Sequence, residues 1–408
     1  MAHFGILTQY YPPEMGAPQA RLSDLARRLC EHGHEVTVLT AMPNYPSGRI
    51  FPGYRALFRR EVRDGVHVLR AGILPTKSIG LVARLVSYFS FVVSSLVVGA
   101  LALPRLDFLL TESPPLFLGI SGFLLARWKR ARWIFNVSDL WPESAVALGI
   151  VSEGPGLALA RRLEAFCYRR AWLVSGQSRE ILDDILRRFP GVPVYHLSNG
   201  VDAEVFHPER GSAEARRRLV GDSEGGHYVA VYAGLHGVAQ GLDQILEALA
   251  GLDGDGPLAV FIGDGPERER LVERAGQLRL RRVRFLDPVP REEVAQLLAS
   301  ADVAMVPLKV RLPGAVPSKV YEAMASGVPV LLVADGEAAD IVRDAGAGIV
   351  VEPGDVAGIR RALASLGKDS NGRRTMGRAG RDSARARFDR SAIAEGFLRH
   401  LEESGACS

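Results

Sequence analysis

The chain has 408 residues, of which 47% are hydrophobic and 24% charged, so it is globular and too long for one ordinary domain. Its three cysteines are far apart and odd in number, which excludes a disulfide framework and favours a reducing compartment. The net charge of +4 is uneven, because residues 1–200 carry 23 Lys and Arg against 15 Asp and Glu, whereas the remainder carry 27 against 31. The basic first half is therefore expected to meet an anionic partner, either a membrane surface or nucleic acid.

The first half alternates short apolar strands with helical patterns. The first strand, 4–8, is followed by a loop and by a helix over 19–32. Further strands are expected at 35–40, 66–71, 107–111, 133–137, 173–175 and 194–197. Strands separated by helices predict a parallel sheet with crossovers, which binds ligands at the carboxyl ends of its strands.

A turn at Asn199-Gly200 opens a polar stretch up to residue 208, where we place the domain boundary. A second alternation follows, with strands expected at 228–233, 258–262, 283–286, 303–306, 328–333 and 348–351. The chain ends in a charged helix over 377–403. The predicted fold is α/β, with two Rossmann-like doubly wound parallel-sheet domains, 1–199 and 200–387, that face a central cleft. We expect the C-terminal helix, 388–408, to pack back on the first domain.

Residues 85–103 form an uncharged run of about 28 Å as a helix, which is long enough to span hydrocarbon. A spanning helix would place the strand at 107–111 across the membrane from the earlier strands and divide the sheet. A core helix, or a helix whose apolar face touches lipid, fits better. The segment 127–133, RWKRARW, mixes cations with indoles, and more arginines precede it at positions 55, 59, 60 and 63. This composition favours peripheral contact with an anionic membrane.

A loop that leads into a short helix, 314–330, is the strongest candidate site. Backbone N–H groups and the helix dipole at residues Val316, Pro317, Ser318, Lys319 and Val320 would attract a phosphate, although Pro317 itself has no N–H. Lys319 carries a positive charge in the first turn, where a purely structural helix favours an acid. Glu322 lies one turn later and could accept two ribose hydroxyls. The alternative is a surface loop with a solvated lysine and glutamate.

Glycine-rich loops follow several other strands. The candidate donor-binding residues in them are Gly16, Gly234, His236, Gly237, Gln240, Gly263 and Gly265. The last two resemble a dinucleotide fingerprint, but Arg268 replaces its third glycine, so we reject an NAD site and keep the loop as a wall of the ligand site. Asp253-Gly254-Asp255 has the spacing of a metal-binding pair but lies at the wrong end of the sheet, so it is predicted to be a turn. No metal site is expected.

Asp139, Trp141 and Glu143 follow the strand at 133–137 and are the candidate acceptor-binding residues. Asp139 could act as a catalytic base or accept a hydroxyl. It could also cap the next helix, because Pro142 and Glu143 suit a first turn.

Together these segments resemble family 4 glycosyltransferases with the GT-B fold, in the branch that builds colanic acid, capsule and O-antigen units. The motifs that carry the resemblance are QYYPPE at 9–14, GHEVTV at 33–38, DLWPES at 139–144, NGVD at 199–202, GDGP at 263–266 and PSKVYE at 317–322. The resemblance implies a nucleotide-sugar donor in the second domain, an acceptor in the first, retention of configuration and no metal or other cofactor. It also implies that Glu322 holds the ribose. The sequence departs from the family pattern in two places. Gly314 occupies the position of the first glutamate in the family's E-x7-E pair. His236 and Gln240 align near the positions at which the family often has Arg and Lys.

The sequence therefore predicts a retaining hexosyltransferase with Asp139, Lys319 and Glu322 as catalytic residues. Its donor is predicted to be a UDP-sugar such as a UDP-N-acetylhexosamine, and its acceptor a polyprenyl-diphosphate-linked sugar at an anionic membrane surface. Nucleic acid is not an expected partner. Residues 1–13 do not resemble a signal peptide, so we expect a cytoplasmic protein peripheral to the inner face of the membrane. The alternatives are a nucleotide-sugar epimerase of the same fold and a non-catalytic sugar-nucleotide binding protein.

Overall fold

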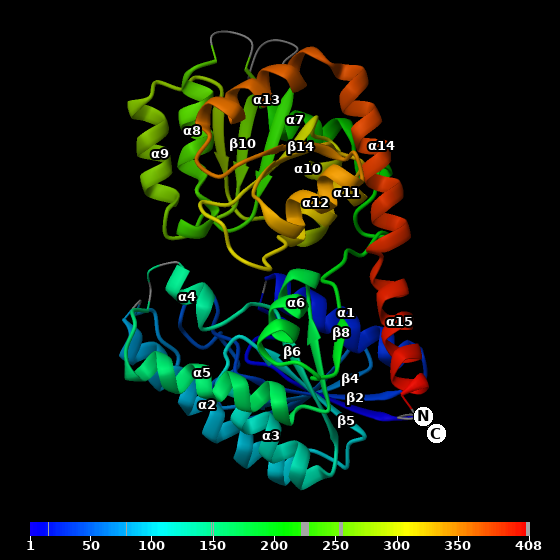
Figure 1. Ribbon diagram of the computed structural model, residues 1–408. Coiled ribbons are helices and arrows are strands. Elements are labelled where there is room, and N and C mark those ends of the chain that lie inside the picture. Colours follow the sequence, from blue (N-terminus) through cyan, green and yellow to red (C-terminus); the bar gives the residue numbers. More distant parts are fainter. Residues whose placement is uncertain are drawn as a thin grey trace. The chain divides into compact units, whose positions relative to one another are not determined.

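The computed structural model describes residues 1–14, 16–78, 80–147, 149, 151–221, 228–252 and 256–404. The predicted turn at Asp253-Gly254-Asp255 lies outside these residues. The chain divides into two compact units, one formed by Met1–Asn199 and the residues from Ser391 onward, the other by Gly200–Arg390 (Figure 1). Each unit is a β-sheet with helices on both faces.

The first unit contains an eight-stranded sheet in the order β3-β4-β2-β1-β5-β6-β7-β8. Its strands are β1 (His3–Leu7), β2 (Glu35–Ala41), β3 (Phe58–Arg63), β4 (Val66–Ala71), β5 (Phe108–Ser113), β6 (Arg132–Val137), β7 (Leu173–Gly176) and β8 (Val194–His196). All neighbours are parallel except β3, which pairs antiparallel with β4 and was not predicted. Asp64 and Gly65 join these two strands with φ values of 51° and 78°, as a tight hairpin turn requires.

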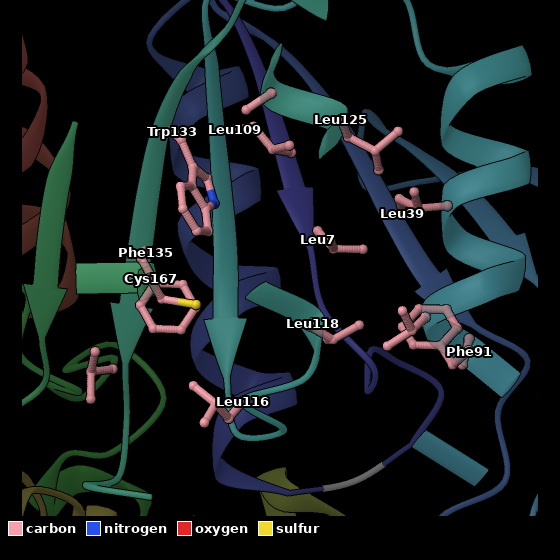
Figure 2. Packing of buried hydrophobic residues seen from close by; sticks show 14 of the residues in the cluster. Leu7, Leu39, Phe91, Leu109, Leu116, Leu118, Leu125, Trp133, Phe135 and Cys167 are labelled. Carbon is pink, nitrogen blue, oxygen red and sulfur yellow. The ribbon is translucent and has the colours of Figure 1, made fainter. Parts of the chain in front are cut away.

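The helices of this unit cover the sheet on both faces. They are α1 (Ala17–Glu31), α2 (Leu81–Ala102), α3 (Leu118–Lys129), α4 (Glu143–Ala147), α5 (Pro155–Arg170), α6 (Arg179–Arg188) and α15 (Arg390–Glu403). Alternate strand residues face opposite sides. Leu7, Leu39 and Leu109 pack toward α2 and α3 in the cluster that Figure 2 shows. Phe4 and Ile6 belong to a second cluster, formed with α1 and α15.

The second unit contains a six-stranded parallel sheet in the order β11-β10-β9-β12-β13-β14. Its strands are β9 (Val229–Ala233), β10 (Leu258–Ile262), β11 (Val283–Leu286), β12 (Val303–Pro307), β13 (Val330–Val333) and β14 (Gly348–Val351). The order reverses between β9 and β12, and ligands of such sheets bind at this reversal. This confirms the predicted architecture of two doubly wound parallel sheets.

Two sets of helices flank the second sheet. One face packs against α8 (Leu242–Ala250), α9 (Arg268–Gln277) and α13 (Val356–Lys368). The other packs against α7 (Ala213–Val220), α10 (Arg291–Ala299), α11 (Ser318–Ala325), α12 (Gly336–Asp344) and α14 (Ser370–Arg387).

The single C-terminal helix predicted over 377–403 is wrong, because α14 ends at Arg387 and α15 begins at Arg390. Between them the backbone pairs with Val201. The Val201 N–H donates to the Phe388 carbonyl at 2.8 Å, and the Arg390 N–H donates to the Val201 carbonyl at 3.0 Å. These bonds replace helical ones and separate the two helices.

Candidate functional site

Lys319 lies in the first turn of α11 at the carboxyl edge of the second sheet. Its ammonium lies 5.6 Å from the ring centre of Tyr232, and among the described residues it forms no ion pair. Burial lowers its pKa, and the negative charge of Glu322 only partly opposes this effect. A Cβ added at Gly234 would come within 2.3 Å of Lys319 Cε and would displace this lysine, and the backbone φ of 146° at Gly234 also favours glycine. The residues predicted to bind a phosphate thus place an uncompensated cation beside the N-terminus of a helix.

His236 lies next to Lys319, in the loop after β9. Its side chain is fully buried, and neither ring nitrogen has a hydrogen-bond partner among the described residues. Burial lowers its pKa to about 4, and the positive charges of Arg268 and Lys319 act in the same direction. The imidazole is therefore neutral at physiological pH, with one nitrogen able to donate a hydrogen bond and the other able to accept one.

The loop after β10 supports the loop after β9. The backbone N–H of His236 donates to the Asp264 carbonyl at 2.9 Å, and the backbone N–H of Glu267 donates to the His236 carbonyl at 3.0 Å. A Cβ at Gly263 would come within 2.0 Å of the Gly234 carbonyl oxygen, and a Cβ at Gly265 within 2.4 Å of the His236 carbonyl oxygen. These two predicted donor-binding glycines therefore allow one loop to pack on the other.

The remaining predicted residues of this unit lie on the same edge. Gly237 precedes the short 3-10 helix Val238–Gln240, which Gln240 ends, and the Gln240 Oε1 is buried without a hydrogen-bond partner among the described residues. Val316 and Val320 are buried, so their contribution would come from the backbone. Pro317 precedes α11 and Ser318 opens it without a side-chain cap. Lys319 and Glu322 also line a small pocket, whose other walls are Val231, Ala233, Val294, Leu298, Ala304, Met305 and Val306.

The acceptor residues predicted in the first unit follow β6. Burial raises the pKa of the Asp139 carboxyl, although it accepts hydrogen bonds from the Ser144 hydroxyl at 2.9 Å and from the Leu140 N–H. Glu143 forms a two-bond ion pair with Arg161, which holds the pKa of that carboxyl below its usual range. The Trp141 ring packs 5.5 Å from Phe117. Glu143 is thus engaged by an arginine, whereas Asp139 is held by neutral donors.

Gly16 precedes α1 with extended backbone, φ 164° and ψ 168°. A Cβ there would come within 2.4 Å of Gln19 Oε1, so this glycine leaves room for a neighbouring side chain. Its predicted role toward the donor stays a prediction.

A buried polar network that the sequence analysis missed lies beneath the carboxyl edge of the first sheet. Arg21 donates to Glu112 at 2.6 Å, to Ser138 at 2.8 Å and to Asn199 at 3.0 Å. Glu112 also accepts from Asn136 and Ser138. The network holds Ser138, which directly precedes Asp139. The available signal was Glu112, a charge near the end of the fully buried strand β5.

Arg381 of α14 supports α11 from its other end. Its guanidinium donates to the Ala325 carbonyl at 2.8 Å and to the Phe206 carbonyl at 2.9 Å. A cation at a helix C-terminus satisfies free carbonyls and opposes the negative end of the dipole. Among the described residues, no group of three or more His, Cys, Asp and Glu side chains is placed to hold a metal ion.

Comparisons with known proteins agree with this arrangement. The family model Glycosyl transferase 4-like domain matches residues 16–200, and Glycosyl transferases group 1 matches residues 218–383. The chain is a family 4 glycosyltransferase with the GT-B fold. This glycosyltransferase is 27% identical over 369 residues to WcaI of Escherichia coli K12, named a colanic acid biosynthesis glycosyl transferase. The aligned region covers 86% of this chain and 90% of WcaI. It is 29% identical over 266 residues to the glycosyltransferase WbjE of Pseudomonas aeruginosa, covering 64% of this chain and 66% of that one.

Solved structures share the fold of this glycosyltransferase. Sucrose-phosphate synthase from Thermosynechococcus elongatus superposes with a TM-score of 0.80 at 20% identity, over 100% of both chains. Anabaena HepE in complex with UDP-glucose gives a TM-score of 0.75 at 17% identity, over 99% of this chain and 100% of that one. The fold and the family predicted from the motifs are therefore confirmed.

Proposed function

We propose that this glycosyltransferase transfers a sugar, such as an N-acetylhexosamine, from a UDP-sugar to a polyprenyl-diphosphate-linked acceptor, with retention of configuration, in surface polysaccharide synthesis. The observation that carries the proposal is Lys319, a partly buried cation without an ion pair in the first turn of α11. A buried charge without a partner is costly, and binding of an anion would remove that cost. A nucleoside diphosphate is such an anion.

The chemistry requires stabilisation of a diphosphate as it leaves. Lys319 and the N-terminus of α11 supply positive charge, and neutral His236 supplies one N–H. Glu322 is close enough to influence the pKa of Lys319 and has no partner of its own among the described residues, which suits a clamp on ribose hydroxyls. Asp139 is the proposed base or hydroxyl acceptor, and its raised pKa suits a group that exchanges protons.

Two relatives support the nature of the substrates. HepE, whose fold this chain shares, was solved with UDP-glucose, which supports a UDP-sugar as donor. The name of WcaI refers to colanic acid biosynthesis, which supports an acceptor in surface polysaccharide assembly.

An exposed apolar surface on the first unit supports a membrane-held acceptor. Helix α2 presents Val82, Val86, Phe89, Val93, Val97 and Leu101 to the outside at helical spacing. The stretch Val82–Ala102 is apolar and long enough to cross a membrane, and its most apolar 18-residue window is only 28% buried. Because β4 and β5 on either side of α2 belong to one sheet, α2 is a crossover helix that lies on that sheet and not a span.

Neighbouring helices extend this surface. In Figure 1, α3 lies beside α2 and α5 lies beside α3, and α3 and α5 expose Leu124, Trp128, Leu159 and Phe166. We call these ten residues of α2, α3 and α5 the apolar face. Arg127 and Arg130 are exposed next to Trp128, whereas Lys129 donates to the carbonyls of Ala100 and Leu103 and so caps α2. Exposed apolar side chains beside cations suit a peripheral site on an anionic bilayer at the cytoplasmic side.

A thermal-shift titration tests the donor site. UDP and UDP-sugars should raise the melting temperature with concentration in the wild type, and GDP, ADP and NAD should do so less. Lys319→Ala should weaken UDP binding about tenfold to 150-fold, as loss of a charged hydrogen bond worth about 1.5–3 kcal/mol implies. Lys368→Ala, an exposed lysine of α13, is the matched control and should bind like the wild type. A wild type that responds to NAD and to no nucleoside diphosphate would contradict the proposal.

An epimerase of the same fold is the second candidate, and a non-catalytic binding protein the third. An epimerase needs no membrane, so binding to vesicles separates it from the transferase. Val93→Asn with Val97→Asn should abolish sedimentation with phosphatidylglycerol vesicles, whereas Val272→Asn, an exposed position on α9, should not. Turnover of a UDP-sugar with a lipid-linked acceptor then excludes the third candidate.

A further inference from the structure

Four aromatic side chains from separate elements form a continuous row in the first unit. Phe117, just before α3, lies 6.2 Å from Tyr88 and 4.8 Å from Phe89, both on α2, measured between ring centres. On its other side Phe117 lies 5.5 Å from Trp141, in the loop after β6. We call Tyr88, Phe89, Phe117 and Trp141 the aromatic row. It connects helix α2 with the segment that contains Asp139.

The two ends of the row differ in surroundings. Phe89 is 42% exposed and belongs to the apolar face. Trp141 lies two residues after Asp139, and its N–H donates to the Asp139 carbonyl at 2.8 Å. The other three rings are neither fully buried nor fully exposed, unlike the core residue Trp133, which is 4% exposed. The row therefore offers partly open aromatic surface from the apolar face to the predicted catalytic segment.

A cation without a partner lies beside the row. Arg84 is one turn before Tyr88 on α2, and among the described residues its guanidinium has no ion pair or hydrogen bond. It lies close to Tyr10, where its positive charge opposes the rise that burial causes in the pKa of that phenol. Tyr10 follows β1, and its ring lies 5.5 Å from that of Tyr45. Arg84 therefore supplies a positive charge at the same strand edge as Asp139, although the Glu14 carboxyl also lies close to Tyr10.

An apolar surface, a row of partly open rings and a free guanidinium complement an amphiphile that has an anionic head and an unsaturated apolar chain. We propose that the aromatic row binds the first isoprene units of a polyprenyl-diphosphate acceptor and that Arg84 binds its diphosphate; this rests on the function proposed above. Aromatic rings suit this role because they give large apolar contact at a low cost in side-chain entropy. Arg84 would add a bidentate contact to phosphate oxygens.

Binding of geranylgeranyl diphosphate, used below its critical micelle concentration, tests the proposal directly. Tyr88→Ala and Arg84→Gln should each weaken binding by about tenfold, as loss of one aromatic or charged contact implies. Pyrophosphate without a prenyl chain should bind far more weakly than the prenyl compound. Val97→Ser is the matched control, because it lies on the same exposed stripe of α2 two turns beyond Phe89. It should leave geranylgeranyl diphosphate binding unchanged and weaken only binding to phosphatidylglycerol vesicles.

Three results would overturn the proposal. The wild type could fail to bind geranylgeranyl diphosphate, or Tyr88→Ala and Arg84→Gln could bind it as tightly as the wild type does. Val97→Ser could also weaken this binding as much as Tyr88→Ala and Arg84→Gln do, which would indicate general lipid adsorption. Phe89→Asn, at an exposed position, repeats the test without altering a half-buried side chain. The UDP thermal shift of each variant reports folding. If the wild type shifts with UDP but binds no prenyl diphosphate, only this inference fails; if UDP gives no shift, the proposed function itself fails.

Discussion

The carboxyl edges of the two sheets treat buried charge in opposite ways. At the first edge, Arg21 and Glu112 are almost fully buried and face each other at 2.6 Å within a network of neutral hydrogen-bond partners. At the second edge, Lys319 has no ion pair among the described residues, and both nitrogens of His236 lack partners. At the first edge each of the two charges has an ion-pair partner, whereas the second edge leaves, among the described residues, a cation without an ion pair and an imidazole without a hydrogen bond.

From this difference we expect the buried network of the first edge to act as a scaffold and the unpaired groups of the second edge to bind the donor. Unsatisfied buried polar groups are rare in folded proteins, and each one costs stability. A protein that retains them at a helix N-terminus gains when an anion binds there. The charge-paired network of the first edge, in contrast, fixes Ser138 and the segment that follows it without any ligand. Removal of one charge at each edge should therefore change stability with opposite sign.

The largest effect is expected at the first edge, for Glu112→Ala. This change leaves the Arg21 guanidinium buried without its carboxylate, which should lower the free energy of unfolding by about 3–5 kcal/mol. Denaturant unfolding measures it. Arg218→Ala, which removes an exposed ion pair with Glu293, is the control and should cost about 0–1 kcal/mol. Equal losses in both variants would show that the buried pair has no special role.

A smaller loss is expected from Gly265→Ala, which tests whether the loop after β10 holds the loop after β9. The added Cβ would lie 2.4 Å from the His236 carbonyl oxygen and would force the two backbones apart. We expect a loss of about 2–3 kcal/mol and weaker UDP binding, since His236 would move. Gly276→Ala in α9 is the matched control, because nothing lies within 4 Å of its added Cβ. It should gain about 0.5–1 kcal/mol. Normal UDP affinity in Gly265→Ala would contradict the supporting role.

Much of the fold could be predicted, because alternating strands and helices each produce a local pattern of apolar and polar residues in the sequence. The strands at 66–71, 258–262, 283–286 and 348–351 have the predicted bounds. The edge strand β3 was missed because its arginines obscure the alternation of apolar and polar residues that is typical of a strand. The dipeptide Asp64-Gly65 nevertheless favours a hairpin turn. The break between α14 and α15 depends on pairing with Val201, a contact between distant parts of the chain that no local pattern contains.

The candidate site was predictable where chemistry depends on a short motif. Lys319, Glu322 and His236 lie together because each follows a strand of one parallel sheet. The pairing of Glu143 with Arg161, and of Arg21 with Glu112, could not be foreseen, since the partners are 18 and 91 residues apart. Only the structure distinguishes a carboxylate held by arginine from one held by neutral donors.

Lys319→Met should change stability in the direction opposite to Glu112→Ala. Methionine keeps the apolar chain of lysine and removes the unpaired charge, so the unliganded protein should gain about 1–2 kcal/mol in free energy of unfolding. UDP should no longer stabilise it as it stabilises the wild type. Thermal unfolding with and without UDP measures both effects. A loss of stability in the unliganded variant would indicate that Lys319 has a structural partner.

The smallest effect concerns the pH dependence that His236 imposes. Its folded pKa of about 4 lies below the ordinary value of 6.5, so the unfolded chain takes up a proton more readily than the folded one. Stability from neutral His236 is thus fully present above pH 6.5 and is lost as the pH falls toward 4. Between pH 7 and pH 5 we expect the wild type to lose about 1–2 kcal/mol more than His236→Gln, whose amide does not titrate. Parallel urea titrations at the two pH values measure this difference.

Because a bound diphosphate favours the protonated imidazole, UDP should reduce the pH-dependent loss of stability in the wild type and leave the pH dependence of the glutamine variant unaffected. A wild type whose pH dependence equals that of the variant, with and without UDP, would show that His236 is solvated and does not belong to the unpartnered edge.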